Sequence, residues 1–403
     1  MLQARLMKSG TTQTTAANEL FGIYIHWPFC ASLCPYCDFN AHVRDHIDHE
    51  RWAQAYRREL DYIASYTRGK VVTSIFFGGG TPSLMHPATT EAILDRIYAN
   101  WPVSANAEVT MEANPTSVEA DKFTAFRAAG VNRLSLGIQA LNDNDLEFLG
   151  RTHNRDQALQ ALAIANDHFP RVNFDLIYAR PNQRPQDWEA ELVYALSLAQ
   201  KGHLSLYQLT IERGTKFATQ FQRGEFTIPD SDSGAEFYDI TQAACESAGM
   251  PAYEVSNHAV PGEESAHNML YWRGGLYAGV GPGAHGRIQD RDGPIYATVA
   301  HRAPEIWLER VERDGHGYHP FNPLTPLERA QEMLMTGLRM REGVSLDALA
   351  AKLGAPVEEL IDMARVDSLA DAGFVNLDRT ANRLHPTQAG MRCLNSVLSY
   401  IMR

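Results

Sequence analysis

The stretch Cys30-Ala-Ser-Leu-Cys34-Pro-Tyr-Cys37 follows a short apolar segment and contains three of the five cysteines in this 403-residue chain. Three thiolates can hold three irons of a four-iron cluster, which leaves the fourth iron without a protein ligand. Clusters that only carry electrons normally have four cysteine ligands. The spacing therefore predicts a cluster whose open iron is available to bind and activate another molecule.

Other uses of these cysteines fit the sequence less well. Disulfides would need an oxidising compartment, and nothing in the chain indicates export. A closed zinc site needs a fourth Cys or His at a matched spacing. His26 and His42 flank the loop, so a zinc knuckle of three cysteines and one histidine stays open as an alternative. The distant Cys245 and Cys393 are predicted to be ordinary buried thiols.

Composition narrows the class of protein. The chain is 44% hydrophobic and 21% charged, as globular proteins are. A net charge of −12 argues against a nucleic-acid partner held through its phosphates. Residues 1–20 are polar and lack the apolar core of a signal peptide, and no apolar run approaches the ~20 residues that span a bilayer. We expect a cytoplasmic protein without a transmembrane segment, whose residues 1–20 are extended or disordered.

Short β-rich runs alternate with helical stretches along most of the chain. Strands are predicted at residues 22–26, 73–77, 108–111, 133–137, 171–175 and 204–209, and helices at 48–66, 89–98, 118–129, 156–168, 188–199 and 236–247. This alternation calls for a parallel sheet with right-handed crossovers. The pattern alone fits either an open doubly wound sheet or a partial (β/α)6 barrel.

Polar and glycine residues at the carboxyl ends of these strands favour the barrel. They are the run from Gly78 to Thr81, Glu112, Gln139, Asp175, and Gln208 with Glu212. A barrel gathers the carboxyl ends of its strands around one mouth, where active sites lie. The triple glycine lets a ligand lie against bare backbone and supplies free amide donors. We therefore predict an α/β fold in which the cysteine loop and these residues share one mouth.

The tail from residue 321 is predicted to be a small helical, winged-helix-like domain. Helical spacing covers residues 345–353, 357–372 and 389–401, and a hairpin is expected at 374–377 and 383–385. That shape often binds DNA, but the segment has no basic stripe. It is interpreted as a packing or partner-binding domain.

The Cys-x-x-x-Cys-x-aromatic-Cys spacing resembles the radical S-adenosylmethionine (radical SAM) superfamily. The resemblance implies one [4Fe-4S] cluster per chain, held by Cys30, Cys34 and Cys37, with S-adenosylmethionine chelating the open iron. One electron from the cluster then cleaves the sulfonium to give methionine and a 5′-deoxyadenosyl radical. The resemblance implies that the S-adenosylmethionine pocket is lined by Tyr24, Tyr36, Gly79, Gly80, Thr81, Glu112, Gln139, Arg151 and Asp175, with Arg155 as a rival to Arg151.

Within that superfamily the chain resembles the branch of oxygen-independent coproporphyrinogen III oxidases and HemW-type heme chaperones. Residues 21–310 match the radical SAM domain with its extension, and residues 321–403 match the C-terminal domain. Phe39 stands where the decarboxylating oxidases have a fourth cysteine, and those oxidases also have a longer N-terminal extension. The run from His267 to Trp272 resembles the His-Asn-x-x-Tyr-Trp motif of the chaperones, whose histidine is implicated in heme binding. Neutral imidazole is a common ligand of heme iron; His258 and His285 are less favoured alternatives.

These matches are closest to the HemW family and imply a heme chaperone rather than an enzyme. Such a protein would bind heme, a [4Fe-4S] cluster and S-adenosylmethionine, and hand heme to apo-hemoproteins such as those of respiratory membrane complexes. A homodimer is compatible with this interpretation. The alternatives are oxidative decarboxylation of coproporphyrinogen III and another radical SAM reaction on a tetrapyrrole.

Overall fold

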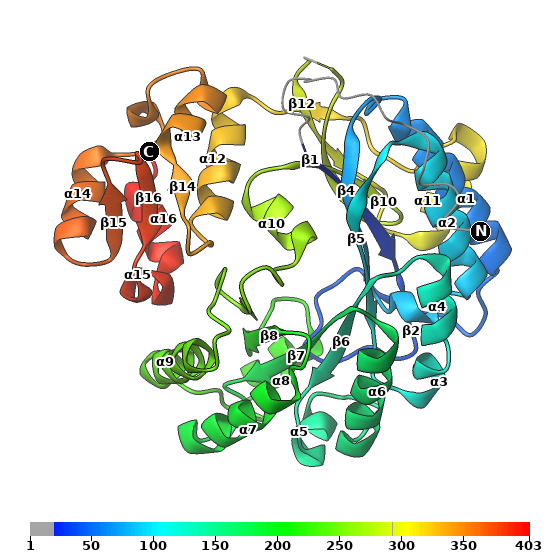
Figure 1. Ribbon diagram of the computed structural model, residues 1–403, viewed down its shortest axis with the longest axis horizontal. Helices are drawn as coiled ribbons and strands as arrows, with labels where there is room; N and C mark the ends of the chain where they lie inside the picture. The colour runs from blue at the N-terminus through cyan, green and yellow to red at the C-terminus, as the bar shows by residue number, and fades with distance from the viewer. Residues whose placement is uncertain (1–19, 292) are drawn as a thin grey trace.

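The computed structural model describes residues 20–291 and 293–403, so the predicted extended segment before Leu20 lies outside the described residues (Figure 1). Within the described residues, one 11-stranded sheet runs in the order β13-β12-β11-β10-β1-β4-β5-β6-β7-β8-β9. The sheet curves around an interior, and most helices cover its convex side (Figure 1).

All six predicted strands are present and adjacent in the sheet, each parallel to the next. The α/β fold predicted from the alternation is therefore confirmed, and so is the partial barrel that the polar residues at the strand ends favoured. A further strand, β10 (Leu276–Val280), pairs parallel with the other side of β1 and was not predicted. The six are β1 (Leu20–Trp27), β4 (Val71–Gly79), β5 (Val103–Ala113), β6 (Arg133–Gln139), β7 (Arg171–Tyr178) and β8 (His203–Gln208).

Short antiparallel strands extend both edges of the sheet. They are β9 (Asn257–Ala259) beside β8, and β11 (His285–Gln289), β12 (Ile295–Val299) and β13 (Asn322–Pro323) beyond β10. Sequence reasoning missed all of them because each is only two to five residues long and carries little periodic signal.

The predicted helices of the barrel are confirmed, with one exception. They are α1 (His49–Ala64), α2 (Pro87–Asn100), α6 (Arg155–His168), α7 (Pro185–Leu198) and α9 (Ser231–Ser247). The single helix predicted at 118–129 is wrong: α3 (Ser117–Ala120) and α4 (Phe123–Ala129) are separate. Buried Glu119 accepts hydrogen bonds from Ser83 and from the Asn114 amide, and so ties α3 to the end of β5. The shorter α5 (Asp143–Phe148), α8 (Lys216–Gln222) and α11 (Pro304–Asp314) were not predicted.

The two faces of each central strand have different environments. On β1, Ile23, Ile25 and Trp27 are buried in the main hydrophobic core beneath α1. On the interior face, polar side chains such as Glu108 and Arg133 are buried within the barrel. The helix α10 (Ala266–Trp272) lies against this interior face, between the sheet and the C-terminal helices (Figure 1). The barrel interior is therefore closed by a helix far along the chain.

The C-terminal residues have their own hydrophobic core and the expected winged-helix-like pattern of helices with a hairpin. Two helices predicted there are wrong. The stretch 357–372 divides because Asp362 caps a new helix through the Ala364 and Arg365 amides, and the stretch 389–401 breaks at Cys393. The elements are α12 (Pro326–Gly337), β14 (Val344–Ser345), α13 (Leu346–Leu353), η3 (Val357–Glu359), α14 (Met363–Asp371), β15 (Val375–Asp378), β16 (Arg383–Pro386), α15 (Gln388–Arg392) and α16 (Leu394–Ile401).

None of the helices in the described part of the chain has both the length and the apolar character needed to cross a membrane.

Candidate functional site

The cysteine loop is fixed at both ends. The short strands β2 (Phe29–Cys30) and β3 (His42–Val43) pair in parallel and close the loop. Between them, the Asn40 amide group donates hydrogen bonds to the carbonyl oxygens of Pro282 (3.0 Å) and Arg302 (2.9 Å). The loop is therefore held against the segments that follow β10 and β12.

Cys30, Cys34 and Cys37 line one cavity of about 420 Å³ at the carboxyl ends of the central strands. This is where the barrel prediction placed the site. The cavity is also lined by most of the residues predicted for S-adenosylmethionine: Tyr36, Gly79, Gly80, Thr81, Glu112, Gln139, Arg151 and Asp175. The structure thus brings together residues from five strands and their loops.

The cysteine sulfurs accept hydrogen bonds from polar side chains of the cavity. The Thr81 hydroxyl donates to Cys30 Sγ at 3.4 Å, and Arg151 Nη1 donates to Cys34 Sγ at 3.3 Å. Burial nevertheless raises the pKa of the Cys30 thiol to about 11. A thiolate at this position needs nearby positive charge, which iron and a guanidinium can supply.

Arg151, and not Arg155, lines the cavity. Its Nη2 donates to Asn114 Oδ1 at 2.6 Å and to the Gly137 carbonyl at 2.9 Å, while its buried Nε has no hydrogen-bond partner. The guanidinium of Arg155 instead lies 5.4 Å from the centre of the Tyr194 ring. An unpartnered donor in the cavity wall suits a site that is completed by a ligand.

Three carboxyl groups line the cavity, and besides Glu119, which is hydrogen bonded to Ser83, they are Glu112 and Asp175. Glu112 accepts a hydrogen bond from the Gly79 amide at 3.2 Å. Burial, together with the nearby Asp175, raises the pKa of Glu112 to about 8. Burial also raises the pKa of Asp175 to about 6. A cation in the cavity would lower both values, so these carboxyl groups fit the ammonium and sulfonium groups of S-adenosylmethionine.

The glycine loop differs from the prediction of free amide donors. The Gly79 amide donates to Glu112, and the Gly80 amide donates to the Trp27 carbonyl at 2.7 Å. The missing side chains instead make room for protein. A Cβ on Gly79 would lie 2.6 Å from the His26 ring, and one on Gly80 would lie 2.7 Å from the Phe29 carbonyl oxygen.

Tyr24 and the histidines near the loop have other partners. The Tyr24 hydroxyl lies 3.0 Å from His26 Nδ1 and is not among the groups that line the cavity. His26 Nε2 lies 3.0 Å from the Asn40 carbonyl oxygen, and His42 Nε2 lies 3.2 Å from Asn40 Oδ1. Neither histidine contacts a cysteine sulfur, as the zinc alternative would require. In the described ranges, no group of three His, Cys, Asp or Glu side chains is arranged to hold a single metal ion.

His267 lies away from the cysteine cavity, in α10. It is 1% exposed, and its ring nitrogens lie 2.8 Å from Ser74 Oγ and 2.6 Å from the Tyr271 hydroxyl. Burial lowers the pKa of His267 to about 3, so the imidazole is neutral. At the other end of the motif, the Arg339 guanidinium lies 4.8 Å from the Trp272 ring centre. Coordination of heme by His267 stays a prediction that requires α10 to move.

Asn114 is a functional candidate that sequence reasoning missed. Its side chain donates to Thr81 Oγ1 at 3.1 Å and accepts from Arg151, so it connects the two side chains that contact cysteine sulfurs. Its position two residues after Glu112, at the end of β5, was the available signal.

Comparison with known proteins identifies relatives of the whole chain. Residues 24–194 match the model of the radical SAM superfamily, and residues 324–393 match that of the HemN C-terminal domain. The chain is 41% identical over 340 residues to the radical S-adenosyl methionine domain-containing protein 1, mitochondrial, of Bos taurus (83% of this chain, 77% of the relative). It is 35% identical over 382 residues to the heme chaperone HemW of Escherichia coli strain K12 (94% and 97%).

A solved structure shares the fold. The coproporphyrinogen III oxidase HemN of Escherichia coli, described as a radical SAM enzyme, aligns with a TM-score of 0.78 over 95% of this chain and 90% of that one. The sequences are 20% identical in this alignment, so the likeness supports the fold alone. It agrees with the predicted barrel and C-terminal domain.

Proposed function

This chain belongs to the radical SAM family that includes the HemW heme chaperones, and from that premise we propose that it binds heme and transfers it to apo-hemoproteins. The observation that carries the proposal is the 35% identity to the heme chaperone HemW of Escherichia coli, which extends over 94% of this chain and 97% of that one. The likeness therefore includes α10 and the C-terminal domain as well as the cysteine loop.

We also propose that Cys30, Cys34 and Cys37 hold a [4Fe-4S] cluster and that the same cavity binds S-adenosylmethionine. When both are bound, such a cluster can supply one electron to the sulfonium. Arg151 supplies positive charge beside Cys34, and the carboxyl groups of Glu112 and Asp175 suit a cationic ligand. The remaining cavity residues Tyr36, Gly79, Gly80, Thr81 and Gln139 would shape the pocket. Tyr24 would support it through His26, which contacts the Tyr24 hydroxyl and packs against Gly79.

His267 is proposed to coordinate heme in a form of the protein in which α10 has left the barrel interior. The contacts that hold the helix there include those of His267 to Ser74 and of its backbone amide to Glu108, while Arg339 of the C-terminal domain lies over Trp272 from the other side. The imidazole is already neutral, which is the form that binds iron. Apo-hemoprotein clients, including those of respiratory complexes, a cytoplasmic location and a homodimer remain part of the proposal.

Oxidative decarboxylation is the second candidate because the fold matches that of a coproporphyrinogen III oxidase. Phe39, at the position of that branch's extra cysteine, is 63% exposed and lines the mouth of the cavity. Phe39 has no thiol to replace that cysteine in oxidative decarboxylation.

A paired assay on the anaerobically reconstituted protein separates the two functions. Coproporphyrinogen III with S-adenosylmethionine and a reductant should release no carbon dioxide above background, whereas a Soret titration should show stable heme uptake. Carbon dioxide release above background would refute the chaperone proposal. A bound heme with the same Soret spectrum in wild type and His267→Ala would refute the role of His267 as a ligand.

A further inference from the structure

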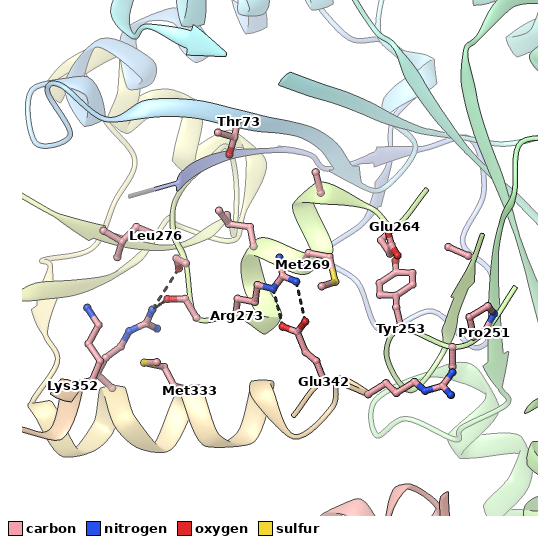
Figure 2. Close-up of a pocket in the computed structure, with 18 residues that line it drawn as sticks. Thr73, Pro251, Tyr253, Glu264, Met269, Arg273, Leu276, Met333, Glu342 and Lys352 are labelled. Carbon is pink, nitrogen blue, oxygen red and sulfur yellow. Dashed lines mark hydrogen bonds and ion pairs between the residues drawn. The ribbon is translucent and has the colours of Figure 1, made fainter. Parts of the chain in front are cut away.

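A second and larger cavity lies on the side of α10 that faces the C-terminal domain. Its volume is about 840 Å³, twice that of the cysteine cavity. Its walls come from α10, the turn that follows it, residues 251–253 and the helices α12 and α13 (Figure 2). Pockets of this size at the junction of two domains commonly hold ligands.

The lining of this cavity has an apolar part. Met269 and Leu270 come from α10, Leu276 begins β10, and Met333 comes from α12 on the facing wall (Figure 2). Methionine side chains adapt to irregular apolar surfaces, and thioethers also serve as axial ligands of heme iron. Gly274 allows this close approach of the two domains, because a Cβ there would lie 2.7 Å from Met333 Cγ.

The lining also has an excess of positive charge in a protein whose net charge is −12. The cationic side chains are Arg273, Arg329, Arg341 and Lys352, against the carboxyl groups of Glu264 and Glu342. Figure 2 shows Arg273 paired with Glu342, at 2.9 Å. Arg341 pairs with Glu246 at 3.1 Å.

Arg273 and Arg341 are available to an anionic ligand. Their side chains are 53% and 62% exposed, and exposed ion pairs contribute only about 0–1 kcal/mol. A ligand carboxylate can therefore replace the protein carboxylate at little cost. Arg329 differs: its side chain is 7% exposed, and it donates to Glu332 and to the Gly274 carbonyl. Arg329 therefore holds α12 against the turn that follows α10.

We propose that heme docks in this cavity, with its propionates on Arg273 and Arg341 and a methionine sulfur of Met269 or Met333 facing the iron. The inference rests on the proposed function. It adds a binding site that heme can occupy while α10 is still inside the barrel. A flat apolar ring with two carboxylates matches the two parts of the lining. His267 does not line this cavity, because its ring packs against Ser74 of β4, so docking does not need its imidazole.

The test is a heme titration of the full chain with its cluster reconstituted. An Arg273→Gln/Arg341→Gln variant should bind hemin about tenfold more weakly or worse, because charge-assisted hydrogen bonds to the propionates are lost. The matched control is Arg51→Gln/Arg379→Gln, which removes two exposed arginines paired with Glu312 and Asp367 outside this cavity. It should bind hemin as wild type does.

Hemin dimethyl ester provides a second measurement that does not depend on the folding of a variant. Wild type should bind the ester more weakly than hemin by a similar factor, and the double arginine variant should bind both forms alike. Equal binding of hemin and its ester by wild type, or unchanged hemin binding by the arginine variant, would overturn the proposed site while leaving heme binding intact. A wild-type protein that binds no heme would instead remove the proposed function and this site together.

The iron ligand is tested separately. Met269→Leu/Met333→Leu keeps the apolar volume but removes both thioethers, so the Soret band of bound heme should shift while its affinity stays within about threefold. An unchanged spectrum would overturn sulfur ligation.

Discussion

The buried carboxylate of Glu108 holds α10 inside the barrel, and we predict that Glu108→Gln strongly destabilises the fold. Glu108 is 4% exposed and lies 2.6 Å from Arg171 Nη1 and 3.8 Å from Arg133 Nε. It also accepts hydrogen bonds from the backbone amides of Ala266 and His267, at the start of α10. One carboxylate therefore neutralises two arginines and caps the helix.

The magnitude follows from burial. The Arg133 side chain is 3% exposed, and removing one partner of a buried ion pair costs about 3–5 kcal/mol. Glu108→Gln should lower the free energy of unfolding by about that amount. The matched control is Glu263→Gln, since Glu263 also pairs with Arg171, at 2.9 Å, but its side chain is 41% exposed. That change should cost about 0–1 kcal/mol.

Urea unfolding followed by circular dichroism measures both variants, and hydrogen exchange at residues 265–272 reports on α10. Burial alone would raise the pKa of Glu108, but Arg133 and Arg171 hold it below the ordinary 4.5. The stabilisation is therefore complete above about pH 4.5 and declines as the pH falls through the folded-state pKa, so the deficit of Glu108→Gln should shrink at low pH. Equal urea midpoints for Glu108→Gln and Glu263→Gln at pH 7 would refute this account.

Three further predictions concern the cysteine cavity. Burial raises the pKa of Glu112 to about 8, so the native state loses stability as the pH rises from 4.5 towards 8. The stability gained by Glu112→Gln should therefore grow between pH 5 and pH 8.5. A gain that is equal at both pH values would contradict the raised pKa. Arg151→Ala should weaken S-adenosylmethionine binding, measured by calorimetry on reconstituted protein, about tenfold or more, because the positive charge and the unpartnered Nε donor of the cavity wall are lost. Arg155→Ala should bind normally, and equal losses in both would refute the assignment. Cys30→Ser should lower the iron content of reconstituted protein from about four per chain to below one, whereas Cys245→Ser should keep it; full iron content in the first variant would contradict the ligand set.

The sequence predicted the parts of the fold that repeat. Alternation of β-rich and helical stretches found the six central strands, and polar residues after those strands predicted one shared mouth. Features that depend on tertiary contacts could not be predicted from the sequence. The amides of Gly79 and Gly80 are satisfied by Glu112 and Trp27, and the break at Asp362 depends on side-chain capping.

The position of His267 shows the same limit. The motif predicted a heme-binding histidine, but burial of α10 depends on Glu108 and Ser74, which lie more than 150 residues earlier. The local pattern offers a partner for one ring nitrogen, because Tyr271 lies four residues along the same helix, but it gives no sign of the bond from the other nitrogen to Ser74. The large cavity behind α10 likewise forms only where α12 meets it.

The central claim is that this protein carries heme and hands it to another protein. The most direct measurement is the rate of heme transfer from the loaded protein to an apo-cytochrome b subunit of a respiratory complex, followed by absorbance at increasing acceptor concentration. Direct handover predicts a rate that rises with acceptor concentration beyond the rate at which heme dissociates by itself. A rate that stays at the dissociation rate at every acceptor concentration would contradict the claim.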